Sequence, residues 1–185
     1  HQRATVAQKQ GWFSKEIHKS KSPEGLCETD QGPRADSSLQ SLAGLKTVFK
    51  EGGTVTAGNS SQISDGASLC LLASDAAIHK HQVKKRAQVM AMSVVGLDPL
   101  EMGMGPVPAI GQLLKKHKMN ISDIDLFEIN EAFAAQALAC QRELEIPSEK
   151  LNPSGGAIAL GHPLGATGTR LITTLLHNLE RLDRE

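Results

Sequence analysis

One histidine in this chain stands among glycines, and this segment constrains the local fold more than any other. His162 lies within GGAIALGHPLGATGTR, over residues 155–170. Glycine permits positive φ and close approach of a ligand to the backbone, and Pro163 fixes the chain directly after the histidine. The following apolar residues recur at helical spacing and predict a helix over residues 166–182. We interpret the segment as a connection that holds one imidazole before a helix, as a catalytic base requires. A Gly-rich turn with an incidental histidine is the alternative.

A second segment, NEAFAAQA over residues 130–137, follows a short apolar stretch that predicts a strand over residues 125–129. Asn130 stands near the expected start of a helix over residues 131–144. Glu131 would lie in its first turn, where the helix dipole favours a negative charge. Capping alone would therefore explain both polar residues.

Taken together, these segments resemble motifs of the thiolase family. NEAFA and GGAIALGHP occur in the order and spacing of that family, and GTVTAGNSSQISDGA, over residues 53–67, precedes them. The stretch over residues 95–109 is similar as well. The likeness extends over residues 7–170, with a poor match at residues 18–30.

The resemblance implies an α/β, thiolase-like layered fold, present here in incomplete form. Family members pack two similar α/β halves together, and an inserted loop region covers coenzyme A. We expect residues 1–52 to be part of that loop region and residues 53–82 to end the N-terminal half. Residues 83–185 would form the C-terminal domain, truncated before its last strands. The chain begins at a histidine and stops directly after a predicted helix, so we expect it to be a portion of a longer protein.

The order of elements agrees with an α/β arrangement, because helical and strand-like patterns alternate. The apolar spacing and capping residues predict these further elements, each by its range: helices over residues 4–17, 39–49, 75–81 and 107–118, strands over 69–73 and 87–95, and a polar loop over 18–38.

The resemblance also implies the roles of two residues. His162 matches the family histidine that takes the proton of a nucleophilic thiol and donates toward a thioester oxygen. Imidazole suits both tasks because it exchanges protons near neutral pH. Asn130 matches the family asparagine that holds a water in an oxyanion hole, so we expect His162 and Asn130 to be catalytic.

Substrate contacts follow from the same resemblance. The residues that match positions near coenzyme A or the substrate tunnel are Ser61, Phe133, Ala57, Phe49 and Arg34. Other interpretations stay open, because Ser61 could be a turn hydroxyl, Phe133 a core aromatic and Arg34 a solvated loop charge.

The cysteines do not match the family. Thiolases use one nucleophilic cysteine and a second one in a Gly-rich loop, and neither motif occurs in this chain. Cys27, Cys70 and Cys140 lack the surroundings that would favour a thiolate. We therefore expect these 185 residues alone to be inactive.

The complete protein is expected to be an acyltransferase. The reaction would be reversible thiolytic cleavage of a 3-ketoacyl-CoA to acetyl-CoA and a shortened acyl-CoA, as in fatty acid β-oxidation. An acetoacetyl-CoA-forming biosynthetic thiolase and a non-catalytic CoA-binding or oligomerisation module are the alternatives. Coenzyme A thioesters would be substrates, no cofactor is expected, and the family implies a homodimer or homotetramer.

Composition and residue patterns narrow the kinds of partner, metal site and cellular compartment that this protein could have. Twenty Lys and Arg residues balance twenty Asp and Glu residues, and no basic patch alternates with stacking aromatics, which argues against nucleic acid as a partner. No apolar run reaches the length of a membrane span. His79 and His81 lack the companions of a metal site. Three unpaired cysteines favour a reducing compartment, the cytoplasm or an organelle lumen of that kind.

Overall fold

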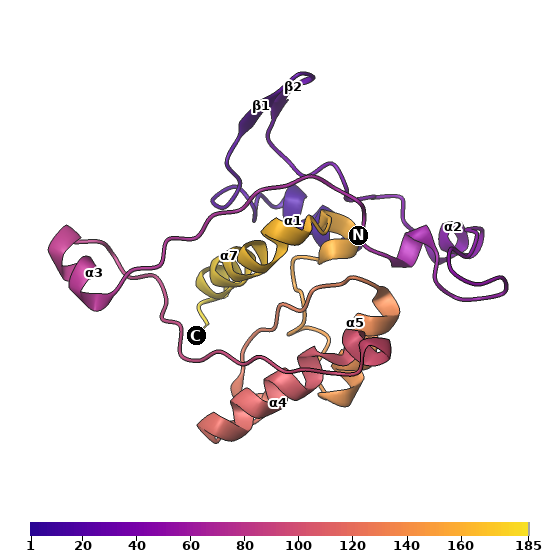
Figure 1. Cartoon of the computed structure of the whole chain (residues 1–185). Coiled ribbons are helices and arrows are strands. Elements are labelled where there is room, and N and C mark those ends of the chain that lie inside the picture. The colour runs from indigo at the N-terminus through magenta and orange to yellow at the C-terminus, as the bar shows by residue number, and fades with distance from the viewer. Residues whose placement is uncertain (185) are drawn as a thin grey trace.

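The computed structural model describes residues 1–184, and a long C-terminal helix lies at its centre. Helix α7 (Leu164–Leu182) has α1 (Gln2–Lys9) on one side, and α4 (Pro106–His117) and α5 (Ala134–Glu143) on the other (Figure 1). It begins two residues before the predicted range because Pro163, with φ −67°, is preorganised for a helix start. Its buried positions are small or polar: Ala166, Thr167, Thr174 and Asn178.

Helix α1 (Gln2–Lys9) is shorter than predicted and packs against the Gly-rich segment. Gly11, with φ 69°, follows the helix, and tight turns replace the helix predicted to continue to residue 17. Ala4 is fully buried, and a Cβ at Gly155 would lie 2.8 Å from the Cβ of Ala4. The approach of α1 to the Gly-rich segment therefore depends on that glycine.

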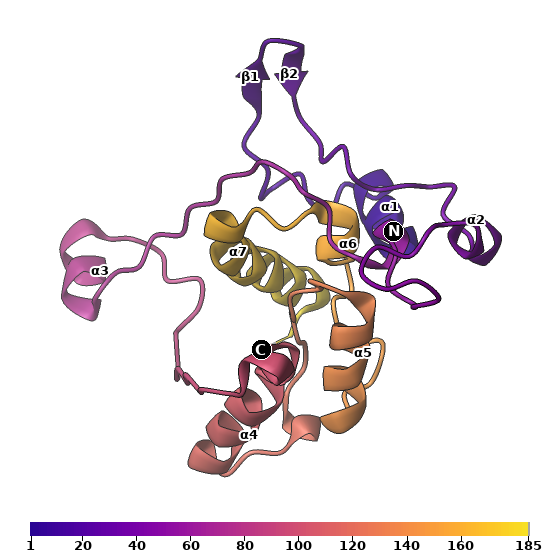
Figure 2. The same cartoon turned by 45° about the vertical axis from the view of Figure 1, so that its right-hand side comes forward.

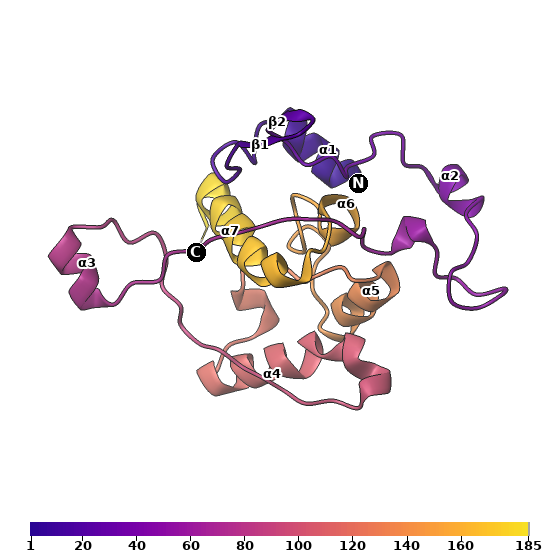
Figure 3. The ribbon, with the colours of Figure 1, turned by 45° about the horizontal axis from the view of Figure 1, so that its top comes forward.

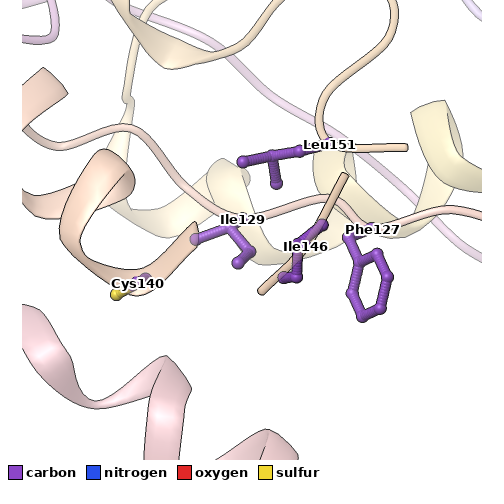
Figure 4. Close-up of a cluster of buried hydrophobic side chains, with 5 residues drawn as sticks. All are labelled: Phe127, Ile129, Cys140, Ile146 and Leu151. Atoms are coloured by element: carbon purple, nitrogen blue, oxygen red, sulfur yellow. The ribbon is translucent and has the colours of Figure 1, made fainter. Parts of the chain in front are cut away.

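The main apolar core lies between α4 (Pro106–His117), α5 (Ala134–Glu143) and the chain that connects them. Both helices lie close to the predicted ranges, and η2 (Pro99–Met104) and η3 (Ile121–Asp123) flank α4. The buried side chains of this core, which Figure 4 shows, are Phe127, Ile129, Cys140, Ile146 and Leu151.

The strand predicted over residues 125–129 is present as a single parallel bridge, Phe127 to Leu151. The backbone N–H of Phe127 donates to Lys150 O at 2.8 Å, and that of Asn152 donates to Phe127 O at 2.9 Å. Beyond the bridge, the Asn152 side chain replaces a neighbouring strand, because it bonds both the N–H and the C=O of Ile129.

The loop predicted over residues 18–38 contains a small antiparallel hairpin, which corrects that prediction. Strands β1 (Ser20–Ser22) and β2 (Gly25–Cys27) pair with Ser20 opposite Cys27, and the hairpin projects away from the helices (Figure 2). Gly25 has φ 124°, which allows the tight reversal.

The strands predicted over residues 69–73 and 87–95 are not formed in the described part of the chain. Both ranges run as unpaired connections on either side of α3 (Asp75–His81), which stands far from the other helices (Figures 1 and 3). A strand needs a hydrogen-bonded neighbour, and within residues 1–184 these ranges have none. Their apolar side chains are exposed, for example Leu69 and Val94.

Two further short helices belong to the segment before residue 60. Helix α2 (Leu39–Ala43) begins at a capping box made by Ser38 and Ser41, and it ends before the predicted residue 49. The chain then reverses, so that Val48 N donates to Val55 O at 2.9 Å. The 3₁₀ helix η1 (Ala57–Asn59) follows this reversal.

Candidate active site

His162 lies at the junction of two helices. The four-residue helix α6 (Ala157–Leu160) ends at Gly161, which has φ 93° and ψ 164°, and α7 begins two residues after His162. Only glycine adopts this backbone conformation readily, and a Cβ on Gly161 would also overlap the Ser64 side chain. The glycine therefore turns the chain sharply enough to bring the imidazole out between α6 and α7.

Both ring nitrogens of His162 have partners. Nδ1 lies 2.7 Å from Thr167 Oγ1, and that hydroxyl donates its single proton to Pro163 O at 2.9 Å. We therefore assign the ring proton to Nδ1, which donates to Thr167, and the lone pair to Nε2. Asn130 Nδ2 lies 3.2 Å from Nε2 and donates to it. The basic nitrogen of the imidazole, Nε2, thus faces Asn130 and accepts from its amide.

A loop from far earlier in the sequence holds the backbone around His162. The N–H of His162 donates to Ser64 Oγ at 3.1 Å. Gln62 Nε2 donates to Ile158 O and Ala159 O in α6, at 2.9 and 3.1 Å. Ser64 and Gln62 lie almost one hundred residues before their partners, so no local pattern indicates them.

Asn130 does not cap a helix, which corrects the prediction made from its position. The N-cap of α5 is Phe133, and no side chain caps that helix. An antiparallel bridge to Ser60 holds Phe133 in an extended conformation, with φ −141° and ψ 145°, so α5 begins only at Ala134. Asn130 Oδ1 is buried and has no hydrogen-bond partner among the described residues. The side chain is therefore turned toward His162 and offers a second polar atom beside it.

The Glu131 carboxylate is also committed elsewhere. Oε1 accepts from Asn152 Nδ2 at 2.9 Å, and Oε2 accepts from Ile158 N at 3.3 Å, in the first turn of α6. The prediction that Glu131 lies in the first turn of α5 is wrong, because α5 begins only at Ala134. The carboxylate serves α6 instead.

Four of the five predicted substrate contacts lie close to the Asn130 segment. Ser61 N donates to Ala132 O at 2.9 Å, beside Phe133. The rings of Phe133 and Phe49 meet edge to face, 5.8 Å apart, and Phe49 is 71% exposed. Ala57 is exposed at the start of η1, in the loop that leads to Ser61.

Arg34 is separate from these residues. It is exposed, and its backbone N–H donates to Nδ1 of His1 at 3.1 Å. Within residues 1–184 no hydrogen bond or ion pair joins it to the other predicted site residues. Its segment nevertheless approaches α6, because Gly32 O accepts from Gln62 Nε2 at 3.1 Å.

An open depression of about 430 Å³ lies at the start of α7, and the nearest residue of its lining to His162 in the chain is Pro163. Residues 64–68 form one wall and residues 163–166 the other. Solvent or a ligand can therefore reach the junction between the Ser64 loop and the first turn of α7.

No cysteine of the described chain hydrogen-bonds to His162. Cys140 is fully buried, its thiol donates to Gly103 O at 3.3 Å, and burial raises the pKa of that thiol. Cys70 is exposed and Cys27 is half-buried. Burial and the raised pKa make Cys140 a poor nucleophile.

Residues 1–184 contain neither a membrane-spanning helix nor a metal-binding cluster. None of the described helices combines the length and apolar character that a bilayer crossing requires. No group of three or more His, Cys, Asp or Glu side chains within the same range could hold a metal ion.

Comparison with known proteins accounts for this arrangement. The family model for the thiolase N-terminal domain matches residues 1–76, and that for the thiolase C-terminal domain matches residues 83–185. A beta-ketoadipyl-CoA thiolase of Acinetobacter baylyi is 50% identical over 187 residues, which cover 97% of this chain and 47% of that protein.

Solved structures agree with the sequence match. Human mitochondrial 3-ketoacyl-CoA thiolase, solved also in complex with CoA, has a TM-score of 0.92 at 41% identity, over 100% of this chain and 47% of its own. The dimeric peroxisomal thiolase of Saccharomyces cerevisiae has a TM-score of 0.88 at 42% identity, over 96% and 46%. The predicted thiolase-like α/β fold is confirmed, and the chain spans about half the length of the relatives it matches. The chain belongs to the thiolase family.

Proposed function

We propose that this chain supplies the histidine and asparagine side of a thiolase active site. The protein would be an acyltransferase that cleaves 3-ketoacyl-CoA thioesters reversibly to acetyl-CoA and a shortened acyl-CoA. One observation carries the proposal: Nε2 of His162 keeps its lone pair and faces Asn130, while Thr167 holds the other ring nitrogen.

The chemistry assigned to these residues is proton transfer and stabilisation of negative charge. His162 Nε2 would take the proton of a cysteine thiol, and the thiolate would attack the 3-keto carbon of the substrate. The bond between C2 and C3 then breaks, and acetyl-CoA leaves as an enolate that takes a proton at C2 from a second cysteine, also beyond these residues. That cysteine then takes the thiol proton of a second coenzyme A, which accepts the acyl group, and the released cysteine thiolate regains its proton from His162. Asn130 Oδ1 would hold a water, and that water would donate to the negatively charged thioester oxygen.

The nucleophile would come from polypeptide beyond these 185 residues. The geometry of Cys140 supports this, because its thiol is buried and bonded to Gly103. We further infer that residues 83–185 are part of the C-terminal domain, residues 53–82 the end of the N-terminal half, and residues 1–52 part of a loop region over coenzyme A.

Coenzyme A would be held by the residues around the Asn130 segment and by the first loop region. The exposed Phe49 ring against Phe133 offers an apolar wall for the pantetheine arm, and Ser61 and Ala57 lie on the loop beside it. Arg34 would contact the phosphate or adenine end. The CoA complex of the human relative supports coenzyme A as the ligand class, and the dimeric yeast relative supports a homodimer or a larger oligomer.

The relatives differ in the acyl group that their names specify. Relatives carry two kinds of name, 3-ketoacyl-CoA thiolase and beta-ketoadipyl-CoA thiolase. A β-ketoadipyl group ends in a carboxylate, whereas a fatty 3-ketoacyl group ends in a methyl. We favour a degradative 3-ketoacyl-CoA thiolase acting in fatty acid β-oxidation, in the cytoplasm or an organelle. Biosynthetic acetoacetyl-CoA formation uses the same residues.

The test is thiolysis by the protein as isolated, with its intact mass measured on the same sample. The substrates are acetoacetyl-CoA, a long-chain 3-ketoacyl-CoA and β-ketoadipyl-CoA, and their relative rates set the acyl class. We expect turnover from a protein about twice this mass, reduced by about 10²–10⁴ in His162→Ala and by about 10²–10³ in Asn130→Ala. Turnover that is unchanged in His162→Ala would refute the proposal.

A sample with the mass of this chain alone is expected to show no turnover. Activity at that mass would refute the assignment of the nucleophile to another segment. Coenzyme A binding without turnover, in a protein of full family length, would instead favour the non-catalytic binding module.

A further inference from the structure

We propose that Glu131 is a positioning residue that sets the separation of Asn130 and His162. The proposal rests on the proposed function of Asn130 and His162, because Glu131 would matter by holding these two residues at the separation that their chemistry needs. Glu131 takes no part in the chemistry itself, since both of its carboxylate oxygens are engaged by other groups.

Glu131 is connected to the histidine through helix α6. Its Oε2 accepts from Ile158 N at 3.3 Å, and Ile158 lies in the first turn of α6. That helix has four residues, and Gly161 and His162 follow it directly. A short rigid segment therefore connects the carboxylate to the imidazole.

Glu131 is connected to the Asn130 segment through the side chain of Asn152. Asn152 is 1% exposed and has a left-handed backbone, with φ 45°. Its side chain bonds Ile129 N and Ile129 O, each at 2.9 Å, and donates to Glu131 Oε1 at 2.9 Å. One buried amide thus fixes the residue before Asn130 and the residue after it.

The Glu131 carboxylate lies very close to the backbone of the Gly-rich segment. A Cβ on Gly156 would overlap the Glu131 carboxylate, with both oxygens 2.5 Å away. The φ of Gly156 is −129°, which other residues adopt, so this glycine is required for space. The carboxylate lies against the backbone that leads into α6, and the distance between the two segments is set by that contact.

The chemical identity of the side chain matters for the same reason. A carboxylate presents acceptors on both oxygens and can receive an N–H from Asn152 and another from Ile158. The amide of glutamine has one acceptor oxygen and one NH₂ group, which only donates, so one of the two N–H groups would face this NH₂. Glu131→Gln is therefore expected to move α6 away from the Asn130 segment.

The experiment is nitrogen NMR of the folded full-length protein, labelled at histidine and asparagine side chains. In the wild-type chain, Nε2 of His162 and the side-chain amide of Asn130 should show a mutual hydrogen bond. Glu131→Gln is expected to shift both signals to positions typical of groups without that bond. Glu143→Gln, an exposed glutamate on α5, is the matched control and should leave both unchanged.

A residue with a merely structural role would lower the melting temperature and leave the two signals of the folded state in place. Unchanged signals in folded Glu131→Gln therefore overturn the proposal. If that variant does not fold, Gly156→Ala is the second perturbation, because its methyl group displaces the carboxylate without changing its charge. Displaced signals in folded Gly156→Ala support the proposal, and unchanged signals overturn it.

A kinetic readout separates this proposal from the proposed function. In the active full-length protein, Glu131→Gln should lower kcat on the order of 10²-fold with little change in KM, because a misplaced pair loses its alignment. If His162→Ala retains turnover, the proposed function fails, while the NMR result still decides the role of Glu131. If His162→Ala is inactive and the NMR signals do not respond to Glu131, only the positioning role fails.

Discussion

Arg170 Nη1 lies 3.8 Å from Oε2 of Glu128, and the Glu128 side chain is 2% exposed. The pair is too long for a hydrogen bond, and both Glu128 oxygens are buried without one among the described residues. Burial raises the pKa of Glu128 to about 8, although Arg170 opposes the rise. Burial likewise raises the pKa of Glu16 to about 7 and that of Asp30. One guanidinium, that of Arg170 on α7, therefore opposes the rise in pKa of all three carboxyl groups.

These carboxyl groups predict a stability that falls as the pH rises. The folded chain holds protons that the unfolded chain releases above about pH 4.5, so the free energy of unfolding decreases until the pH passes the folded pKa of about 8. Glu128→Gln is neutral at every pH and should flatten this decrease by up to about 1.4 kcal/mol per pH unit. Urea unfolding between pH 5 and 8.5 measures the difference. Glu143→Gln, on an exposed face, should keep the wild-type slope, and a Glu128→Gln slope equal to it would contradict the raised pKa.

Thr167 is predicted to fix the tautomer of His162. Thr167→Val removes the hydroxyl that accepts from Nδ1 and keeps the side-chain shape, so the ring proton should redistribute between the two nitrogens. Long-range nitrogen–proton NMR at alkaline pH reports the tautomer directly. Thr167→Ser retains the hydroxyl and should restore the wild-type spectrum. A Val variant with the wild-type spectrum would show that Thr167 does not select the tautomer.

Gly161 should tolerate substitution poorly. Its φ of 93° and ψ of 164° suit glycine only, and an added methyl would overlap Ser64. We expect Gly161→Ala to cost about 1–3 kcal/mol in the free energy of unfolding. Gly168→Ala is the matched control, because it lies within α7 with open space around it, and it should stabilise the chain by about 0.5–1 kcal/mol. Equal effects at the two positions would contradict the strain assigned to Gly161.

The guanidinium of Arg181 should be visible in the fluorescence of the single tryptophan. Its carbon lies 3.7 Å from the centroid of the Trp12 ring, and it donates to Asn178 Oδ1 at 2.9 Å. Arg181→Met keeps much of the apolar stem and loses the charge and the donor. We expect a changed emission spectrum and a loss of about 1 kcal/mol in stability. Arg142→Met, exposed on α5, should change neither.

Cysteine alkylation under native conditions should follow exposure. Cys70 should react first and Cys140 last, because Cys140 is fully buried and its thiol pKa is raised by burial. Mass spectrometry after timed iodoacetamide treatment gives the order, and the same treatment in urea should modify all three cysteines. Fast labelling of Cys140 in the folded chain would make it a candidate nucleophile after all.

The helices α3, α4 and α7 could be predicted from the sequence, because apolar spacing and local end signals coincide there. Ser74 caps α3 through its side chain, and prolines stand at the starts of α4 and α7. The strands could not, since pairing depends on neighbours that sequence patterns do not name. The alternation in residues 87–95 favours a strand, but no neighbour is available to it in the described chain.

The candidate site was predictable in its motifs and not in its supports. Asn130 and His162 come from two recognisable segments, and in the structure Asn130 Nδ2 lies 3.2 Å from His162 Nε2. Ser64 acts over 98 positions and carries no local signal. Thr167, five residues after His162 at the start of a predicted helix, could have been found from its reach to the preceding turn. The capping role of Asn130 was wrong because the distant bridge from Ser60 keeps Phe133 extended, and α5 therefore begins after Phe133.

The hydrogen bond between Ser64 and His162 also determines when the site can be assembled during synthesis. The two residues are 98 positions apart, so at about 5–20 residues per second Ser64 leaves the ribosome roughly 5 to 20 seconds before its partner. Throughout that interval the nascent chain can present the Ser64 loop without the histidine it will hold. The imidazole is fixed only when Thr167 has also emerged, so the order of translation places the Ser64 loop and the Asn130 segment outside the ribosome before the base that they hold.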